Sequence, residues 1–87
     1  MAYTIPGNIT WKNVSSGTVL LNLDSGEYYT LNDTGSLIWA GIMESKESTN
    51  IVANIVAEFE CDESTAESDY NEYIQYLLNE KLLSENK

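Results

Sequence analysis

The stretch Glu27–Met43, which reads EYYTLNDTGSLIWAGIM, constrains the fold more than any other part of the chain. Its first part, Glu27–Leu31, alternates around two tyrosines and predicts a short strand. Asn32 is a favourable helix N-cap, and Asp33 in the first turn suits the positive end of a helix dipole. A helix is therefore expected from here to about Glu44. Because the strand passes straight into the helix, a sheet edge should lie beside a helical core face.

Two more strands are predicted upstream, over residues 9–14 and 18–23, because apolar and polar residues alternate in both. Turns at 15–17 and 24–26 contain glycine and keep the connections short. The three strands should therefore form an antiparallel meander. The residues that share one face are, strand by strand, Ile9 and Trp11; Val19, Leu21 and Leu23; and Tyr29 and Leu31.

Two further helices follow the first. One is expected over residues 48–59, and the last should run from the cap Asp62 to about Glu80. Gly35 is a poor helix former, so its place in the first helix predicts a close backbone contact. The expected core residues are Leu37, Ile38 and Ile42 with Trp39 at the edge; Ile51, Val52, Ile55, Val56 and Phe59; Ala66, Tyr70, Tyr73, Ile74 and Leu77 with Leu78 beside them; and Leu82 and Leu83, folded back.

Three strands followed by three helices predict one α+β domain, a three-stranded antiparallel sheet and a helix trio of winged helix-turn-helix type. We expect this domain over residues 9–83, with an N-terminal tail at 1–8 and a C-terminal tail at 84–87. A chain of 87 residues is one domain and has little room for an enzyme cleft beside its core.

The charge is unusual, because 14 acidic residues face four lysines and the net charge is -10. Histidine and arginine are absent. Such a surface repels nucleic acid and anionic membranes and attracts basic partners. Without arginine there is no bidentate reader of guanine. The chain begins without a basic, apolar signal segment, and no apolar run approaches the roughly 18 residues of a membrane span. A cytoplasmic protein without membrane or nucleic-acid partners is therefore expected.

No constellation of residues indicates catalysis or a metal. Cys61 is the only cysteine, and it has no histidine to activate it as a nucleophile. The acidic residues between Asp62 and Glu72 lack the alternate ligand positions and the central glycine of a calcium loop. We therefore expect no enzymatic activity, no metal and no cofactor.

The segment VLLNLDSGEYYTLNDTGSLIWAGI, then an amphipathic helix, then DYNEYIQYLLNEKLL, resembles the PqqD-like family, which recognises ribosomally made, post-translationally modified peptides. The likeness covers roughly residues 9–83. Lys81 stands where many relatives have glycine. The motif YYTLNDTG is most similar to the stand-alone leader-binding proteins of lasso-peptide pathways. The most specific pieces are the Leu31-Asn32 junction with Gly35 and Ile38 after it, and Asp69-Tyr70 followed by Tyr73, Ile74, Leu77 and Leu82.

The resemblance implies that the leader segment of a precursor peptide binds as an extra strand beside the third strand. Its side chains would enter a groove between that strand and the third helix. The protein would then present the precursor to a separate leader peptidase or modifying enzyme. The peptide-binding residues implied by the resemblance are Glu27, Tyr28, Tyr29, Thr30, Leu31, Asp69, Tyr70, Tyr73, Ile74 and Leu77.

Three alternatives remain beside this interpretation. One is a peptide chaperone of the pyrroloquinoline quinone synthesis type. Another is a winged-helix nucleic-acid-binding protein, against which the missing arginines argue. The last is an interaction module that forms a homodimer through the same strand edge.

Overall fold

The structure is a computed structural model that describes residues 2–15 and 17–86. It confirms the predicted α+β order of a three-stranded antiparallel sheet followed by three helices. Two short strands that the sequence did not predict are added at the ends of the chain. The elements are β1 (Ala2–Thr4), β2 (Ile9–Val14), β3 (Gly17–Asn22), β4 (Tyr28–Leu31), α1 (Asp33–Met43), α2 (Ser48–Phe59), α3 (Glu63–Asn79) and β5 (Ser84–Asn86).

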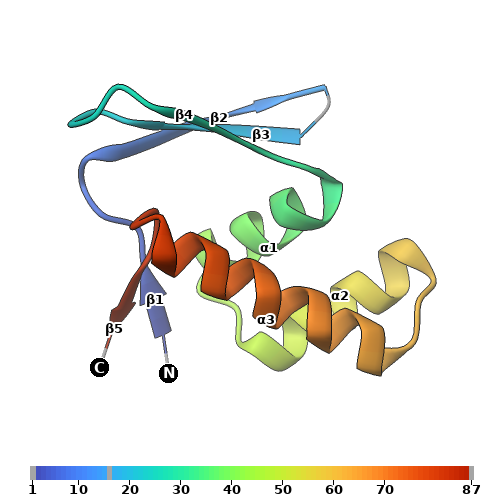
Figure 1. Cartoon of the computed structure of the whole chain (residues 1–87). Helices are drawn as coiled ribbons and strands as arrows, with labels where there is room; N and C mark the ends of the chain where they lie inside the picture. Colours follow the sequence, from blue (N-terminus) through green and yellow to red (C-terminus); the bar gives the residue numbers. More distant parts are fainter. Residues whose placement is uncertain (1, 16, 87) are drawn as a thin grey trace.

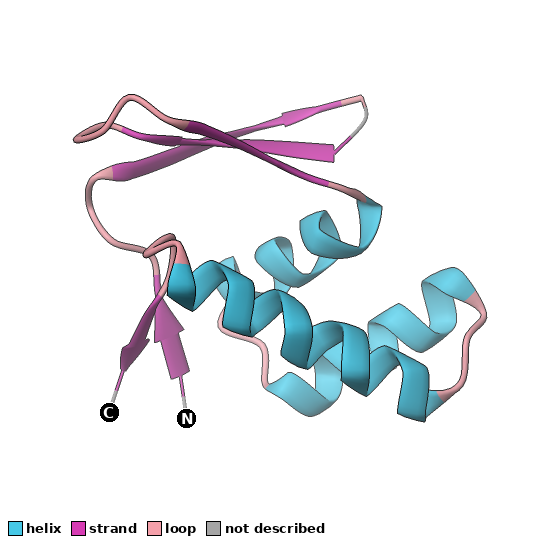
Figure 2. Cartoon of the chain, in the orientation of Figure 1, coloured by secondary structure: helices cyan, strands magenta, loops and turns pink. Residues whose placement is uncertain are grey.

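The sheet β2-β3-β4 forms one layer, and the helices form the layer beneath it (Figure 1). Helix α1 lies directly under the sheet, while α3 crosses in front and packs on α2 (Figure 2). Thr18 of β3 is buried, and its hydroxyl lies 2.8 Å from that of Ser36 on α1. This hydrogen bond joins the sheet to the helix that follows it.

The inner face of the sheet is set by its register. Leu20, which is fully buried, stands opposite Trp11 on β2 and Tyr29 on β4. Val19 and Leu21 do share a face, as predicted, but that face points away from the helices. Residues that stand directly opposite each other on neighbouring strands point to the same face of the sheet. Leu20 therefore points inward together with Trp11 and Tyr29.

Trp39 lies at the centre of the core and not at its edge, contrary to the sequence-based prediction. Its side chain is only 1% exposed, and its ring meets that of Trp11 edge to face at a centroid distance of 5.7 Å. Leu37, which was expected in the buried stripe, is only half-buried. The reason is that Trp11 reaches down from the sheet onto α1, so the helix turns its largest ring toward that contact. Phe59, also expected in the core, is exposed at the end of α2.

Helix α3 ends in a tight turn at Lys81. The backbone φ of Lys81 is 60°, in the left-handed region that glycine adopts more easily. The N–H of Leu82 donates to the carbonyl of Leu77 (2.9 Å), and the N–H of Lys81 donates to that of Leu78 (3.1 Å). This is the hydrogen-bond pattern of a Schellman cap. It returns Leu82 and Leu83 to the core, as predicted.

The two ends of the chain pair with each other. Ala2 stands opposite Asn86, and Thr4 stands opposite Ser84, in a two-stranded antiparallel ribbon. Both strands lie in segments that the sequence predicts as tails, because three-residue strands carry no periodic signal of their own. The ribbon extends away from the sheet in Figure 1, and Tyr3 packs against the core. None of the described helices is long and apolar enough to cross a membrane.

Candidate functional site

Strand β4 is an edge of the sheet, because the order is β2-β3-β4. The N–H of Asn22 donates to the carbonyl of Glu27 (3.0 Å), so the backbone groups of Glu27 face β3. In an antiparallel pair this orientation alternates. Tyr29 and Leu31 therefore also bond to β3, and the N–H and C=O groups of Tyr28 and Thr30 point outward. Within residues 2–15 and 17–86, no strand pairs with that side of β4.

A groove runs between β4 and helix α3. One hollow, of about 280 Å³, is lined by Thr30, Glu72, Tyr73 and Tyr76. A second, of about 150 Å³, continues past the end of the strand and shares Glu72 and Tyr73 with the first. We call the two together the β4–α3 groove. Its complete lining is Thr30, Asn32, Thr34, Asp69, Glu72, Tyr73 and Tyr76.

Tyr73 divides this groove and is held from two sides. Its hydroxyl donates to the side-chain oxygen of Asn32 (2.7 Å), which also accepts from the N–H of Gly35 as the cap of α1 (2.9 Å). The ring lies against Gly35, where an added Cβ would come within 2.6 Å of it. The predicted close contact at Gly35 is thus confirmed, and the contact is with Tyr73. The ring of Tyr76 meets that of Tyr73 edge to face at 6.3 Å and extends the aromatic wall.

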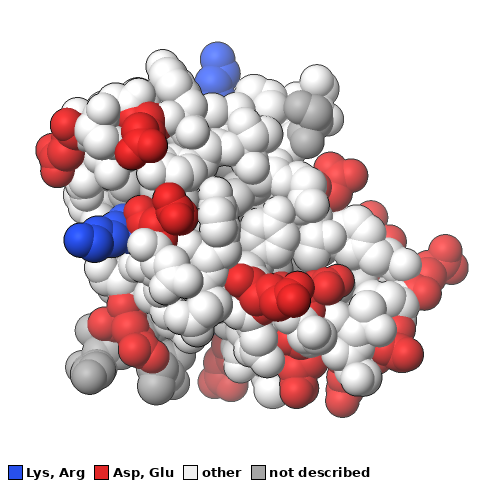
Figure 3. All heavy atoms as spheres, viewed as in Figure 1, with Lys and Arg blue, Asp and Glu red and all other residues white. Residues whose placement is uncertain are grey.

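Carboxylates line the groove and also lie near Tyr29. Glu72 lines both hollows, and Asp69 lines the one beyond the end of β4. The pKa of Tyr29 is raised by loss of hydration first, and then by the negative charges of Glu27 and Glu80. Figure 3 shows most acidic side chains over the helical part of the molecule, with others around the turn between β3 and β4. The site is therefore an aromatic wall with carboxylates beside it, which suits a basic ligand.

The structure separates the predicted site residues into two groups. One group has accessible side chains: Glu27 directly before β4, Tyr28, Tyr29 and Thr30 on β4, and Asp69 and Tyr73 in the groove. The side chains of four others are buried in the core: Leu31, Tyr70, Ile74 and Leu77. The resemblance made them candidates as parts of the third strand and of the third helix, and their apolar spacing is what buries them. Residues that line the groove but were not predicted are Asn32, Thr34, Glu72 and Tyr76.

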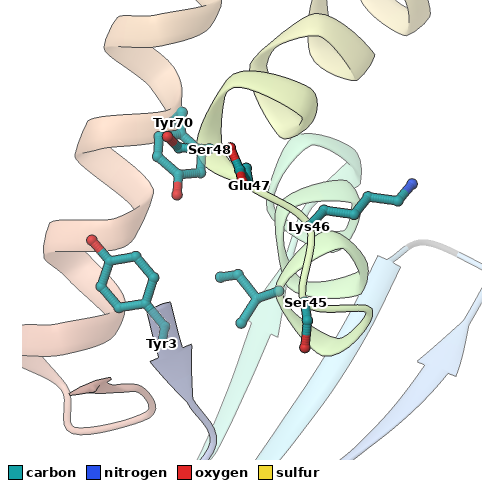
Figure 4. Close-up of a pocket in the computed structure, with 7 residues that line it drawn as sticks. Tyr3, Ser45, Lys46, Glu47, Ser48 and Tyr70 are labelled. Carbon is teal, nitrogen blue, oxygen red and sulfur yellow. The ribbon is translucent and has the colours of Figure 1, made fainter. Parts of the chain in front are cut away.

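Tyr70 lies on the other side of α3, beside a different hollow of about 360 Å³. Figure 4 shows Tyr3 and Tyr70 along one wall of it, with Ser48 and the 45–47 loop opposite. Burial raises the pKa of Tyr70, and Tyr3 adds to the effect. In this close-up Lys46 extends away from the tyrosines. The strand beside this second hollow is β1, which is only three residues long and already pairs with β5 on one side.

The opposite edge of the sheet, β2, differs from β4 in one respect. Lys12 stands in the middle of β2, whereas β4 (YYTL) contains no charged residue. A central lysine is a common protection against unwanted strand pairing. The unprotected edge is therefore the one beside the groove.

In the described part of the chain, no group of acidic or cysteine side chains is placed to hold a metal ion.

The fold and the groove define a small α+β domain of winged helix-turn-helix type with an open, uncharged strand edge. Residues 17–83 match the family model described as "Coenzyme PQQ synthesis protein D (PqqD)", and the chain belongs to this family. No curated protein matches the sequence significantly.

Two solved structures are similar over nearly their whole length. One is described as "TbiB1 in Complex with the TbiA(beta) Leader Peptide"; it is 32% identical, covers 97% of this chain and 98% of its own, and has a TM-score of 0.87. The other, "Lasso peptide synthetase B1 complexed with the leader peptide", is 26% identical, covers 99% of this chain and 100% of its own, and has a TM-score of 0.86.

Proposed function

We propose that this protein binds the leader segment of a ribosomally made precursor peptide as an extra strand on β4. It then presents the precursor to a separate leader peptidase or modifying enzyme in biosynthesis of the lasso type, and it has no catalytic role of its own. The observation that carries the proposal is the open, uncharged edge of β4 beside an aromatic groove. The two similar structures, both of B1 proteins with leader peptides, favour the lasso type over a role in pyrroloquinoline quinone synthesis.

The backbone of β4 offers two donors and two acceptors to a guest strand, at Tyr28 and Thr30. Each hydrogen bond contributes about 0.5–1.5 kcal/mol net. Backbone bonds of this kind give affinity without reading sequence, because every peptide has the same backbone. Selection among peptides must therefore come from the groove.

The groove selects by shape and by charge. Tyr73 and Tyr76 present broad apolar rings with polar tips, which suit an apolar or aromatic leader side chain. Asp69 and Glu72 in the groove, and Glu80 near Tyr29, favour basic residues in the leader. The net charge of -10 also raises the rate at which a basic peptide arrives.

The experiment replaces single backbone N–H groups by ester oxygens through chemical synthesis. An ester at Thr30 removes an outward donor, so leader binding should weaken about fivefold, which corresponds to roughly 1 kcal/mol. Stability should fall only slightly, because the ester also makes the Tyr29 carbonyl, which faces β3, a weaker acceptor. The matched control is an ester at Tyr29, whose N–H faces β3; it should lower stability more, and leader affinity less, than the Thr30 ester does. Binding is measured by anisotropy of a labelled precursor leader. Equal affinity of the Thr30 ester and the unmodified protein would rule out strand addition at β4.

A further inference from the structure

The outer face of the sheet is apolar and uncovered. Its apolar residues are Val14, Val19, Leu21, Leu23 and Tyr28, and Lys12 stands beside them. Tyr28 is 71% exposed, Leu23 60% and Val14 40%. The solvent side of an antiparallel sheet is ordinarily polar. An apolar stripe along the central strand is instead typical of a surface that meets another protein.

The charge of this face differs from that of the helices. Strands β2, β3 and β4 contain no acidic residue, and their only charge is Lys12. Residues 32–83 contain eleven acidic residues and two lysines. The nearest acidic residues, Asp24 and Glu27, lie at one end of the face, in the turn beside Leu23 and Tyr28. A carboxylate of a partner is therefore favoured beside Lys12 and disfavoured over the helices. A basic leader is attracted to the opposite place, the β4–α3 groove, so charge sorts the two ligands.

The area of the face argues against a second copy of this chain as its occupant. Two strands of six residues and one of four span a footprint of roughly 250 Å². Two copies would bury well under the roughly 1,200–2,000 Å² of specific protein interfaces. The charge of -10 on each copy adds repulsion. This face alone is too small for a stable complex, with a second copy or with another protein.

A guest strand on β4 enlarges the face. Side chains alternate along a strand, so every second side chain of the leader would stand in a row beside Tyr28, on the outer side. A protein that docks here then touches both this chain and its bound leader. The face is complete only when the precursor is in place.

We propose that the outer face docks the enzyme that acts on the precursor. The partner surface is apolar at its centre and carries a carboxylate opposite Lys12, and it binds more tightly to the leader complex than to the free protein. This inference rests on the proposed function. It adds which surface of this protein contacts the enzyme and how the enzyme distinguishes the leader complex from the free protein.

The test separates delivery from leader binding. Leu23→Glu and Lys12→Glu alter the outer face at exposed positions, and Phe59→Glu places the same charge on an exposed apolar residue of α2 as a matched control. Leader affinity is measured by anisotropy. Delivery is measured as the rate at which the purified peptidase that cleaves this precursor releases its leader.

We expect Leu23→Glu and Lys12→Glu to lower the cleavage rate at least tenfold while leader affinity stays within twofold. With the Phe59→Glu or Lys12→Arg protein, the peptidase should release the leader at the same rate as with the unaltered protein. Unaltered rates for both outer-face variants would overturn the inference and leave the proposed function intact. Absence of leader binding to the unaltered protein would overturn both. A dimer in light scattering that Leu23→Glu dissociates would assign the face to a second copy and so refute the docking of an enzyme.

Discussion

Replacing Gly35 by alanine should stabilise the fold when Tyr73 is absent and should not stabilise it when Tyr73 is present. In an ordinary helix interior this change stabilises the fold by about 0.5–1 kcal/mol, because alanine loses less backbone freedom than glycine. Here the new Cβ would lie 2.6 Å from the Cε1 and Cζ atoms of Tyr73 and 2.8 Å from its hydroxyl oxygen. These distances are well below the roughly 3.5–4.0 Å of a favourable carbon contact.

The ring of Tyr73 must therefore move by about 1 Å, which opens its 2.7 Å hydrogen bond to Asn32. Loss of that bond costs about 1 kcal/mol and offsets the gain from alanine. Gly35→Ala should thus leave stability unchanged or lower it by up to about 1 kcal/mol. In a Tyr73→Ala background the obstacle is gone, and the same change should stabilise by about 0.5–1 kcal/mol. The coupling energy between the two positions is then about 1 kcal/mol or more.

The assay is a double-mutant cycle in urea, followed by tryptophan fluorescence. Trp39 is buried, so its emission reports the loss of the core. The same four proteins are titrated with labelled leader, because a displaced Tyr73 also reshapes both hollows of the groove. Gly35→Ala should weaken binding about tenfold when Tyr73 is present and have no further effect when it is absent. Equal stabilisation by Gly35→Ala in both backgrounds would show that Tyr73 does not rest on this helix.

Three other changes have definite expected outcomes. Lys81→Gly should raise the free energy of unfolding in urea by about 0.5–1 kcal/mol, because the position has a φ of 60°. Asp62→Asn should weaken the dependence of stability on acid pH, as measured by urea unfolding at several pH values. The N–H of Thr65 donates to the Asp62 carboxylate and lowers its pKa. This cap therefore contributes fully above the ordinary pKa of 3.8, and its contribution is lost as the pH falls below that value. Glu80→Gln should weaken binding of a basic leader up to about fivefold at low salt, with little effect at high salt, and should lower the pKa of Tyr29 in an NMR titration.

Local chemistry was sufficient to predict the elements that begin with a cap. Asn32 accepts from the N–H of Gly35, and Asp62 accepts from that of Thr65, so α1 and α3 begin where the sequence indicated. Both interactions span three residues and depend on nothing distant. The pairing of β1 with β5 joins residues at opposite ends of the chain, and no local pattern reports it. The sequence also did not show which face of β3 points toward the helices, because that depends on its pairing with Trp11 and Tyr29 on the neighbouring strands.

The sequence indicated the β4 side of the candidate groove, and only part of its α3 side. Tyr70, Tyr73 and Tyr76 occur at intervals of three, so each is turned by about 60° from the one before on a helix. Tyr70 and Tyr76 therefore lie about 120° apart, and only the packing of neighbours decides which of them faces the groove. Tyr3 and α2 cover the side of Tyr70, which leaves Tyr76 beside β4.

The pairing of Ala2 with Asn86 makes the two chain ends neighbours, on a ribbon directed away from the sheet. A reporter domain attached at either end would leave from one point and keep clear of a peptide on β4. The same closeness permits a circular permutant, with the old ends joined by a short glycine linker and new ends opened in the exposed 24–26 turn. Such a rearranged chain would carry its new ends next to the bound leader, where a dye or a tethered enzyme would sense or process the peptide directly.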